Sequence, residues 1–153
     1  TTDGGGWTQL YHADFADGSA SGWSMTTTST CGTWGSILGG YGVISGGLIE
    51  RDVYTAYISH SQVRLSMNYL FIDSWDGEIG YVKIDGTEVW SQLHHYSDAS
   101  FNACGHSYAD KREAIEVTKP HTGAIVQLKI GSYLSDSPVD ESFGADNIKV
   151  WIR

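Results

Sequence analysis

Two acidic segments carry the residue types that could do chemistry in this chain. Residues 73–78 read Asp-Ser-Trp-Asp-Gly-Glu, and residues 136–147 hold four carboxylates just before the last apolar run. Calcium takes about six to eight oxygen ligands, which carboxylates and loop carbonyls around a glycine bend can supply. Each segment is therefore a candidate calcium site, although neither has the spacing of an EF-hand loop. Both segments can equally be read as turns whose acidic side chains cap their own backbone or face solvent.

Aromatic side chains are the second group with a chemical use, because tryptophan and tyrosine rings stack on the C–H faces of sugars. The sequence holds 6 Trp and 9 Tyr. In a β-protein most of these rings fill the core or a sheet face, so exposure decides which are free to bind. The candidates for a glycan-binding surface are Trp34, Trp75, Trp90, Tyr96 and Tyr108.

Catalytic chemistry has little support. His94, His95 and His106 could hold zinc or supply a base near Asp98, and this is the weaker reading of them. The nucleophile-elbow, metalloprotease, P-loop, paired-cysteine and dinucleotide motifs are missing from the sequence. A glycosidase whose two acids are distant in sequence would leave no motif, but nothing points to one. We therefore expect a protein that is not an enzyme.

Strands must position these side chains. The clearest strand is a run in which apolar and polar residues alternate, the two-residue period of a half-buried strand. Its apolar positions are Val63, Leu65, Met67, Tyr69 and Phe71. A hairpin is predicted within residues 79–90, where Asp85 and Gly86 suit the two central positions of a type I′ turn.

The remaining chain adds short strands bounded by Gly, Pro, Asp or Ser. They are expected at residues 41–49, 53–59, 114–117, 124–130 and 147–152, with a first strand near Trp7 that carries Leu10 inward. About eight to ten strands that each bury one face favour an all-β fold, a two-sheet antiparallel jelly-roll sandwich with minimal helix. We predict one domain, residues 7–153, after a flexible N-terminal arm at residues 1–6.

Composition and charge limit the partners. The 153 residues include 18 acidic and 9 basic side chains, a net charge of −9, which repels phosphate backbones and anionic lipid headgroups. No apolar run approaches the roughly 20 residues that span a bilayer. We expect neither nucleic-acid binding nor membrane insertion, and the absence of an initial Met and of a signal-type segment suggests a processed, mature chain.

Cys31 and Cys104 are the two cysteines, and each precedes a glycine in a polar, loop-like setting. A buried, inert thiol is poorly housed there, so a single disulfide is favoured over two free thiols, which spacing alone does not exclude. The hydroxyl-rich residues 26–30 ahead of Cys31 suit either O-linked glycans or an edge strand.

The order of several short motifs resembles that of secreted jelly-roll modules, carbohydrate-binding or MAM-like, in surface proteins of protists such as ciliates. These motifs are Asp-Phe-Ala-Asp-Gly at 14–18, Gly-Trp at 22–23, residues 73–78, Cys-Gly at 104–105, and residues 140–148. The resemblance spans nearly the whole chain and implies secretion and structural calcium. It makes Asp14 and Asp146 the first candidate ligands, with Asp17 near the chain start beside them. A possible second group is Asp73, Asp76, Asp140 and Glu141.

Two functions follow from these observations. The first is a non-catalytic extracellular or cell-surface adhesion module that self-assembles into a fibre or layer, with itself as partner through open strand edges. The second is a calcium-dependent, lectin-type domain that binds extracellular glycans. A single uncoupled domain favours the first reading slightly, and self-association or an exposed aromatic strip would separate the two.

Overall fold

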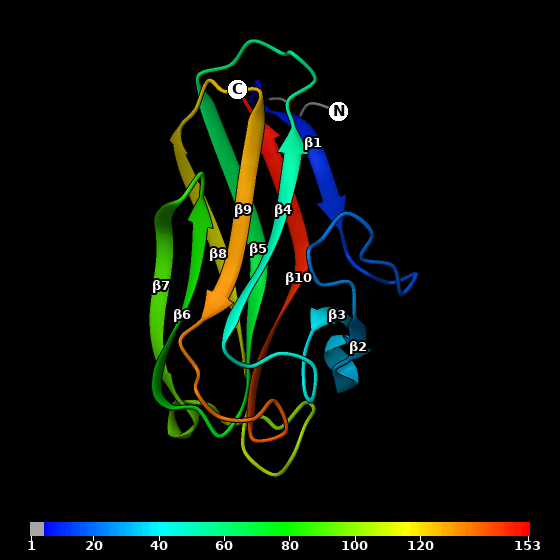
Figure 1. Cartoon of the computed structure of the whole chain (residues 1–153), viewed down its shortest axis with the longest axis vertical. Coiled ribbons are helices and arrows are strands. Elements are labelled where there is room, and N and C mark those ends of the chain that lie inside the picture. Colours follow the sequence, from blue (N-terminus) through cyan, green and yellow to red (C-terminus); the bar gives the residue numbers. More distant parts are fainter. Residues whose placement is uncertain (1–4) are drawn as a thin grey trace.

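The structure is a computed structural model that describes residues 5–153, and within them ten strands form two antiparallel sheets packed face to face (Figure 1). A six-stranded sheet has the order β2-β3-β10-β5-β8, with β1 also paired to β10, and a four-stranded sheet has the order β4-β9-β6-β7. The strands are β1 (Thr8–Ala13), β2 (Thr28–Thr30), β3 (Ser36–Gly39), β4 (Gly47–Tyr54), β5 (Gln62–Asp73), β6 (Asp76–Ile84), β7 (Thr87–His95), β8 (Lys111–Pro120), β9 (Ile125–Ser132) and β10 (Glu141–Ile152). The jelly-roll sandwich predicted from the sequence is confirmed.

The central strand β5 follows its predicted alternation, with its apolar side chains buried between the sheets. From Leu70 onward both of its faces are buried, because a second apolar cluster of Cys31, Ile37, Leu70 and Ile72 covers the outer face there. Strand β10 pairs with β5 along most of its length. Its other edge pairs first with β3 and then with β1, and the ladder to β5 is interrupted near Asn147, whose φ is 50°.

Tyr69 ties the two sheets together. Its ring stacks on Phe143 with 5.6 Å between centroids, and its hydroxyl donates a 2.8 Å hydrogen bond to the Gly131 carbonyl of the opposite sheet. A Cβ at Gly80 would lie 2.6 Å from the Tyr69 ring, so only glycine fits beneath it. Burial raises the pKa of the Tyr69 phenol well above its ordinary value, with a smaller contribution from Tyr81.

The hairpin prediction is confirmed, since β6 and β7 join at Asp85 and Gly86, which have φ values of 52° and 80° as a type I′ turn requires. Two strand predictions are wrong. Residues 41–49 mostly form the turn between β3 and β4, where Gly40, Gly42 and Gly47 have positive φ. Residues 53–59 leave the sheet after two residues, because Ala56 and Tyr57 both adopt left-handed backbone conformations, and two such residues in succession end the extended strand.

Helical structure is confined to two 3₁₀ turns in the described residues, η1 (Gly32–Trp34) and η2 (Tyr96–Asp98). No helix within residues 5–153 has the length and apolar character needed to cross a membrane. Of the hydroxyl-rich residues 26–30, the last three form the edge strand β2. Most of the predicted arm, residues 1–6, lies outside the described residues, and at its end the Gly5 carbonyl accepts a 3.2 Å hydrogen bond from Arg153.

Candidate functional site

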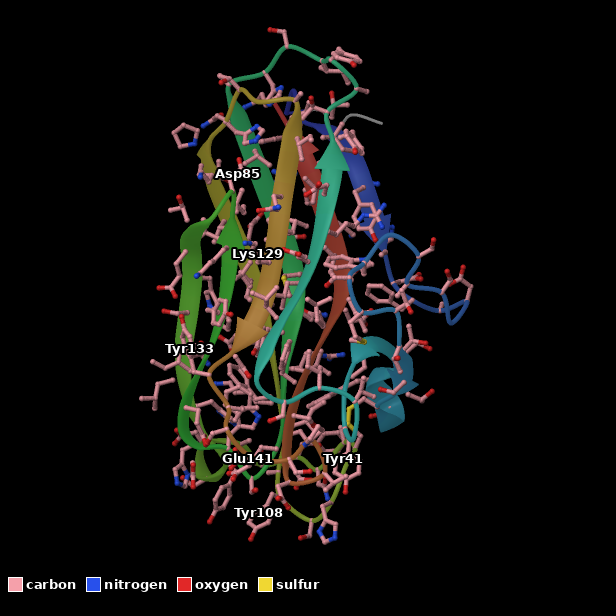
Figure 2. The ribbon with its side chains drawn as sticks, viewed as in Figure 1. Tyr41, Asp85, Tyr108, Lys129, Tyr133 and Glu141 are labelled. Carbon is pink, nitrogen blue, oxygen red and sulfur yellow. A yellow bond between two sulfur atoms is a disulfide. The ribbon has the colours of Figure 1, made fainter. Side chains whose placement is uncertain are left out.

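A cleft of about 620 Å³ opens at one end of the sandwich, where the loops after β5, β7 and β9 converge. Figure 2 labels Tyr108 and Glu141 at this end, and we call this site the end cleft. It is lined by Ser74, Asp76, His95, Tyr96, Tyr108, Asp136, Asp140 and Glu141. Five residues that the sequence singled out therefore lie together, three as candidate metal ligands and two as candidate sugar-binding aromatics.

Tyr96 and Tyr108 form the aromatic wall of the end cleft. Their rings meet edge to face with 4.8 Å between centroids, and Tyr96 also stacks on His95 at 4.7 Å. The backbone N–H of Tyr96 donates to the Trp75 carbonyl at 2.7 Å, which fixes the start of η2. Tyr108 is 42% exposed and offers a ring face to a ligand.

The loop that carries Tyr108 is held by two buried carboxylates. Asp73 accepts hydrogen bonds from the backbone N–H groups of His106 at 2.7 Å and Tyr108 at 3.2 Å. Asp110 accepts from the backbone N–H groups of Asp73, Ala103 and Cys104 at 2.8 to 2.9 Å. Burial raises the pKa of Asp110, and those three hydrogen bonds oppose the rise. Both oxygens of Asp73 thus bind the loop backbone, which gives that residue a structural task.

A disulfide between Cys31 and Cys104 fastens the same loop to the edge of the six-stranded sheet. The pairing agrees with the sequence prediction, and it fits a protein of an oxidising compartment. Trp34, in η1 beside Cys31, is half-buried; its ring packs against Phe101, and the guanidinium of Arg112 lies 5.3 Å from its centre. It does not line the end cleft.

The floor of the end cleft is acidic. One oxygen each from Asp76, Glu78 and Glu141 lie within 4.8 Å of one another. Glu141 is 3% exposed, and burial raises its pKa to about 8, with further contributions from a hydrogen bond that the protonated carboxyl donates to Glu78 and from repulsion by the Glu78 charge. No Lys or Arg is among the residues that line the cleft. The floor offers oxygen acceptors to hydroxyl groups or to a cation.

The other aromatic candidates lie elsewhere. Trp75 is fully buried, donates from its indole N–H to the Ser142 carbonyl at 2.8 Å, and presents no ring face to solvent. Trp90 is half-buried and packs against the rings of Tyr69 and Phe71. Neither tryptophan lines the end cleft, and burial is the property that the sequence did not reveal.

The candidate ligands near the chain start lie apart from the end cleft. Asp14 and Asp17 each accept a 3.0 Å hydrogen bond from a backbone N–H two residues onward, as turn-capping side chains do. Burial raises the pKa of Asp146 to about 6; the hydrogen bond from the Asn147 N–H opposes the rise, and the negative charge of Asp14 adds to it. Asp14 and Asp146 thus interact, but among the described residues no third acidic, His or Cys side chain completes a metal-binding group with them.

The sequence placed Ser74, Glu78 and Asp136 within the two acidic segments and weighed His95 for zinc, but it did not name them among its candidate calcium ligands or sugar-binding residues. Glu78 belongs to the same acidic segment as Asp76 and is only two residues away, a proximity in sequence that could have identified it. Of the three histidines weighed for zinc, His94 is buried against Phe71 and Trp75 and only His95 lines the cleft.

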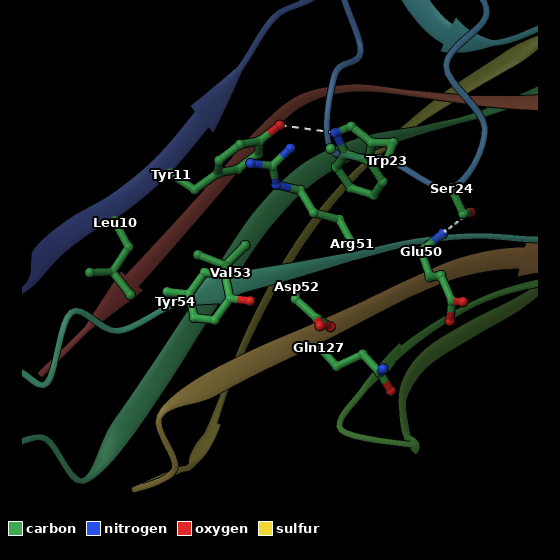
Figure 3. A pocket seen from close by; sticks show the side chains of 11 residues that line it. Leu10, Tyr11, Trp23, Ser24, Glu50, Arg51, Asp52, Val53, Tyr54 and Gln127 are labelled. Carbon is green, nitrogen blue, oxygen red and sulfur yellow. Dashed lines mark hydrogen bonds between the residues drawn. The ribbon is translucent and has the colours of Figure 1, made fainter.

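A second cleft of about 630 Å³ lies between β1, β4 and the loop around Trp23 (Figure 3). Some of its polar groups contact neighbouring residues. Arg51 lies 4.2 Å from the centre of the Tyr11 ring and donates to the Ser21 carbonyl, while the Trp23 indole N–H donates to the Tyr11 hydroxyl at 2.9 Å. None of the residues that the sequence singled out as metal ligands or sugar-binding aromatics lines this second cleft.

The architecture and the end cleft define a jelly-roll module with one loop-built site. No protein-family model and no curated protein matches the sequence. Solved structures do match the fold. The xylan-binding domain CBM22-1 of Paenibacillus barcinonensis Xyn10C aligns over 95% of this chain and 94% of its own, with a TM-score of 0.56 and 11% identity. The K3 cleaved adhesin domain of Lys-gingipain from Porphyromonas gingivalis aligns over 95% and 99%, with a TM-score of 0.54 and 9% identity.

Dimeric latent PorU from Porphyromonas gingivalis also matches, with a TM-score of 0.61 and 10% identity over 95% of this chain. The chain spans only 12% of the length of PorU. At such low identities, these likenesses show that the three proteins share a fold with this chain.

Proposed function

We propose that this chain is an extracellular, non-catalytic glycan-binding module that holds a saccharide in the end cleft. The observation that carries the proposal is the pair of tyrosine rings, Tyr96 and Tyr108, set at 4.8 Å beside a floor of carboxylates. A pyranose presents C–H faces that stack on such rings and hydroxyl groups that donate to such acceptors. The likeness in fold to a xylan-binding domain supports the same function.

The chemistry of the lining suggests the class of saccharide. Asp76, Asp136 and Asp140 are exposed acceptors, and no Lys or Arg lines the cleft to pair with a negative charge. A neutral, hydroxyl-rich sugar therefore suits the bare cleft better than a uronate or a sulfated sugar. A small, open site of this kind binds weakly, with dissociation constants on the order of micromolar to millimolar.

Titration calorimetry with neutral oligosaccharides, including xylo- and cello-oligosaccharides, tests the proposal. Tyr108→Ala is expected to weaken binding about tenfold, which corresponds to about 1.4 kcal/mol for a lost ring contact. Tyr96→Ala should act in the same direction, and the double variant should abolish measurable binding.

Tyr57→Ala is the matched control, because Tyr57 is 98% exposed in the loop between β4 and β5 and does not line the end cleft. Its affinity should equal that of the unmodified chain. If the double variant still bound sugar, or if Tyr57→Ala abolished binding, the sugar site would lie outside the end cleft. Release of new reducing ends from the oligosaccharide would contradict the non-catalytic part of the proposal.

A further inference from the structure

The geometry points to a calcium site formed by Asp76, Glu78 and Glu141 at the floor of the end cleft. This inference goes beyond the proposed function and does not depend on it, because a cation can bind there whether or not a sugar does. Two separate observations support it: the mutual spacing of the three carboxylates, and a buried carboxylate oxygen of Glu141 without a hydrogen-bond partner.

The spacing matches one ion. Calcium binds oxygen at about 2.3–2.6 Å, so two ligands on opposite sides of the ion lie about 4.6–5.2 Å apart, and neighbouring ligands lie closer. One oxygen from each of Asp76, Glu78 and Glu141 falls within 4.8 Å of the others. A single cation can therefore contact all three carboxylates with little rearrangement.

The buried oxygen of Glu141 supplies the second observation. Glu141 is 3% exposed, and its Oε2 has no hydrogen-bond partner. A buried carboxylate oxygen without a partner costs free energy, and the carboxylates of Asp76 and Glu78, each with an oxygen within 4.8 Å of one of Glu141, add the repulsion of neighbouring negative charges. A divalent cation removes both penalties, because it satisfies the oxygen and neutralises the cluster.

The strands hold the three ligands in place. Asp76 and Glu78 lie at the start of β6, and the backbone N–H of Asp76 donates to Glu78 Oε1 at 2.8 Å. Glu141 begins β10 and pairs with Asp73 of β5. The ligands thus come from the first residues of β6 and β10, and both of these strand starts lie beside the end of β5. The site is therefore ordered before an ion binds.

The donor set favours calcium over zinc and magnesium. The three ligands are all carboxylates, whereas zinc prefers nitrogen and sulfur ligands. Magnesium demands near-ideal octahedral geometry, while calcium accepts irregular arrangements and completes its shell with water or loop oxygens. Ser74, Asp136 and Asp140 also line the cleft and offer further oxygens. Of the seven calcium ligands predicted from the sequence, the proposed site uses two, Asp76 and Glu141, and it adds Glu78 as a third.

The test is calorimetric titration of the chelator-treated full chain with CaCl₂ alone, with no sugar present. One equivalent of calcium should bind, and thermal unfolding should shift to higher temperature in its presence. Asp76→Asn and Glu78→Gln should each weaken calcium binding at least tenfold. Asp76 is exposed and Glu78 is half-buried, so neither belongs to the core, and circular dichroism without calcium should match that of the unmodified chain.

Asp146→Asn is the matched control, because it removes one carboxylate at the other candidate position and should leave calcium affinity unchanged. Calcium binding that is lost in Asp146→Asn but kept in Asp76→Asn would overturn the assignment, as would a chain that binds no calcium. Neither result would touch the glycan proposal, whose test uses neutral sugars and the Tyr108 variant.

Discussion

At the scale of single residues, His94 shows how burial sets a chemical property. Burial lowers the pKa of this imidazole to about 4, with smaller effects from the charges of Lys111, Asp98 and His95. The unfolded chain then binds more protons than the native one between pH 4 and the ordinary pKa of 6.5, so stability rises with pH in this window. As pH falls from 6.5 to 4, the protein should lose about 3 kcal/mol through His94.

Chemical unfolding at a series of pH values measures this loss. His94→Phe should flatten the acid side of the stability profile, because a phenyl ring packs against Phe71 and Trp75 without titrating. His12→Gln is the control, since His12 is exposed, and its profile should keep the slope of the unmodified chain. An unchanged slope in His94→Phe would assign the acid sensitivity to other groups.

The sequence identified candidate residues by type but could not rank them by exposure. Tyr96 and Tyr108 were two of five aromatic candidates, and they line the cleft because η2 and the loop before β8 bring them together. Trp75 belongs to an equally suggestive acidic segment, yet it is fully buried. Burial depends on which distant strands pack over a residue, and local sequence carries little of that information.

At the scale of elements, the loop of residues 101–110 positions Tyr108 and depends on the disulfide. Cys31 and Cys104 are 73 residues apart, and cross-linking a loop of that length stabilises a protein by about 4 kcal/mol in the chain-entropy model. The double variant Cys31→Ser/Cys104→Ser should therefore lower the free energy of unfolding by up to about this amount, measured by urea denaturation.

The same variant should bind sugar more weakly, because the loop that carries Tyr108 would lose its covalent link to the sheet and keep only non-covalent contacts, among them the hydrogen bonds to Asp73 and Asp110. Asp76 and Glu78 belong to β6, not to this loop, so calcium binding should change less than sugar binding. Equal stability with and without the disulfide would show that the two buried carboxylates suffice to order the loop.

Elements with a strong local signal were predicted well. The alternation in β5 and the Asp85–Gly86 turn are short-range patterns, and both elements are present. Residues 41–49 failed because their apolar side chains suggested a strand, while the glycines among them adopt the positive φ of a turn. Whether a glycine-rich apolar stretch forms a strand or a turn depends on how the strands on either side of it pair. That pairing involves residues far away in the sequence.

At the scale of the whole molecule, the open question is whether copies of the chain assemble, as one of the two readings of the sequence predicts. Assembly by strand addition needs a free, uncharged edge. The edge strand β8 carries Lys111, Arg112, Glu113, Glu116 and Lys119 and ends at Pro120, and charges and proline both oppose pairing with another strand. The edge strand β4 carries Glu50, Arg51 and Asp52 in its centre. A net charge of −9 adds repulsion between copies.

We therefore expect sedimentation velocity at physiological salt to give a monomer, both with calcium and with chelator. Bound calcium would reduce the net charge by two, which is too little to remove the repulsion or the charged edges. Raising the salt concentration screens the repulsion between copies but leaves the charged side chains and Pro120 on β8 and β4, so these two edges should still form no filaments. Oligomers or filaments would favour the assembly reading. Oligomers lost in a variant of Tyr54 or Tyr57, exposed aromatics at the end of β4 and in the loop after it, would locate the contact there.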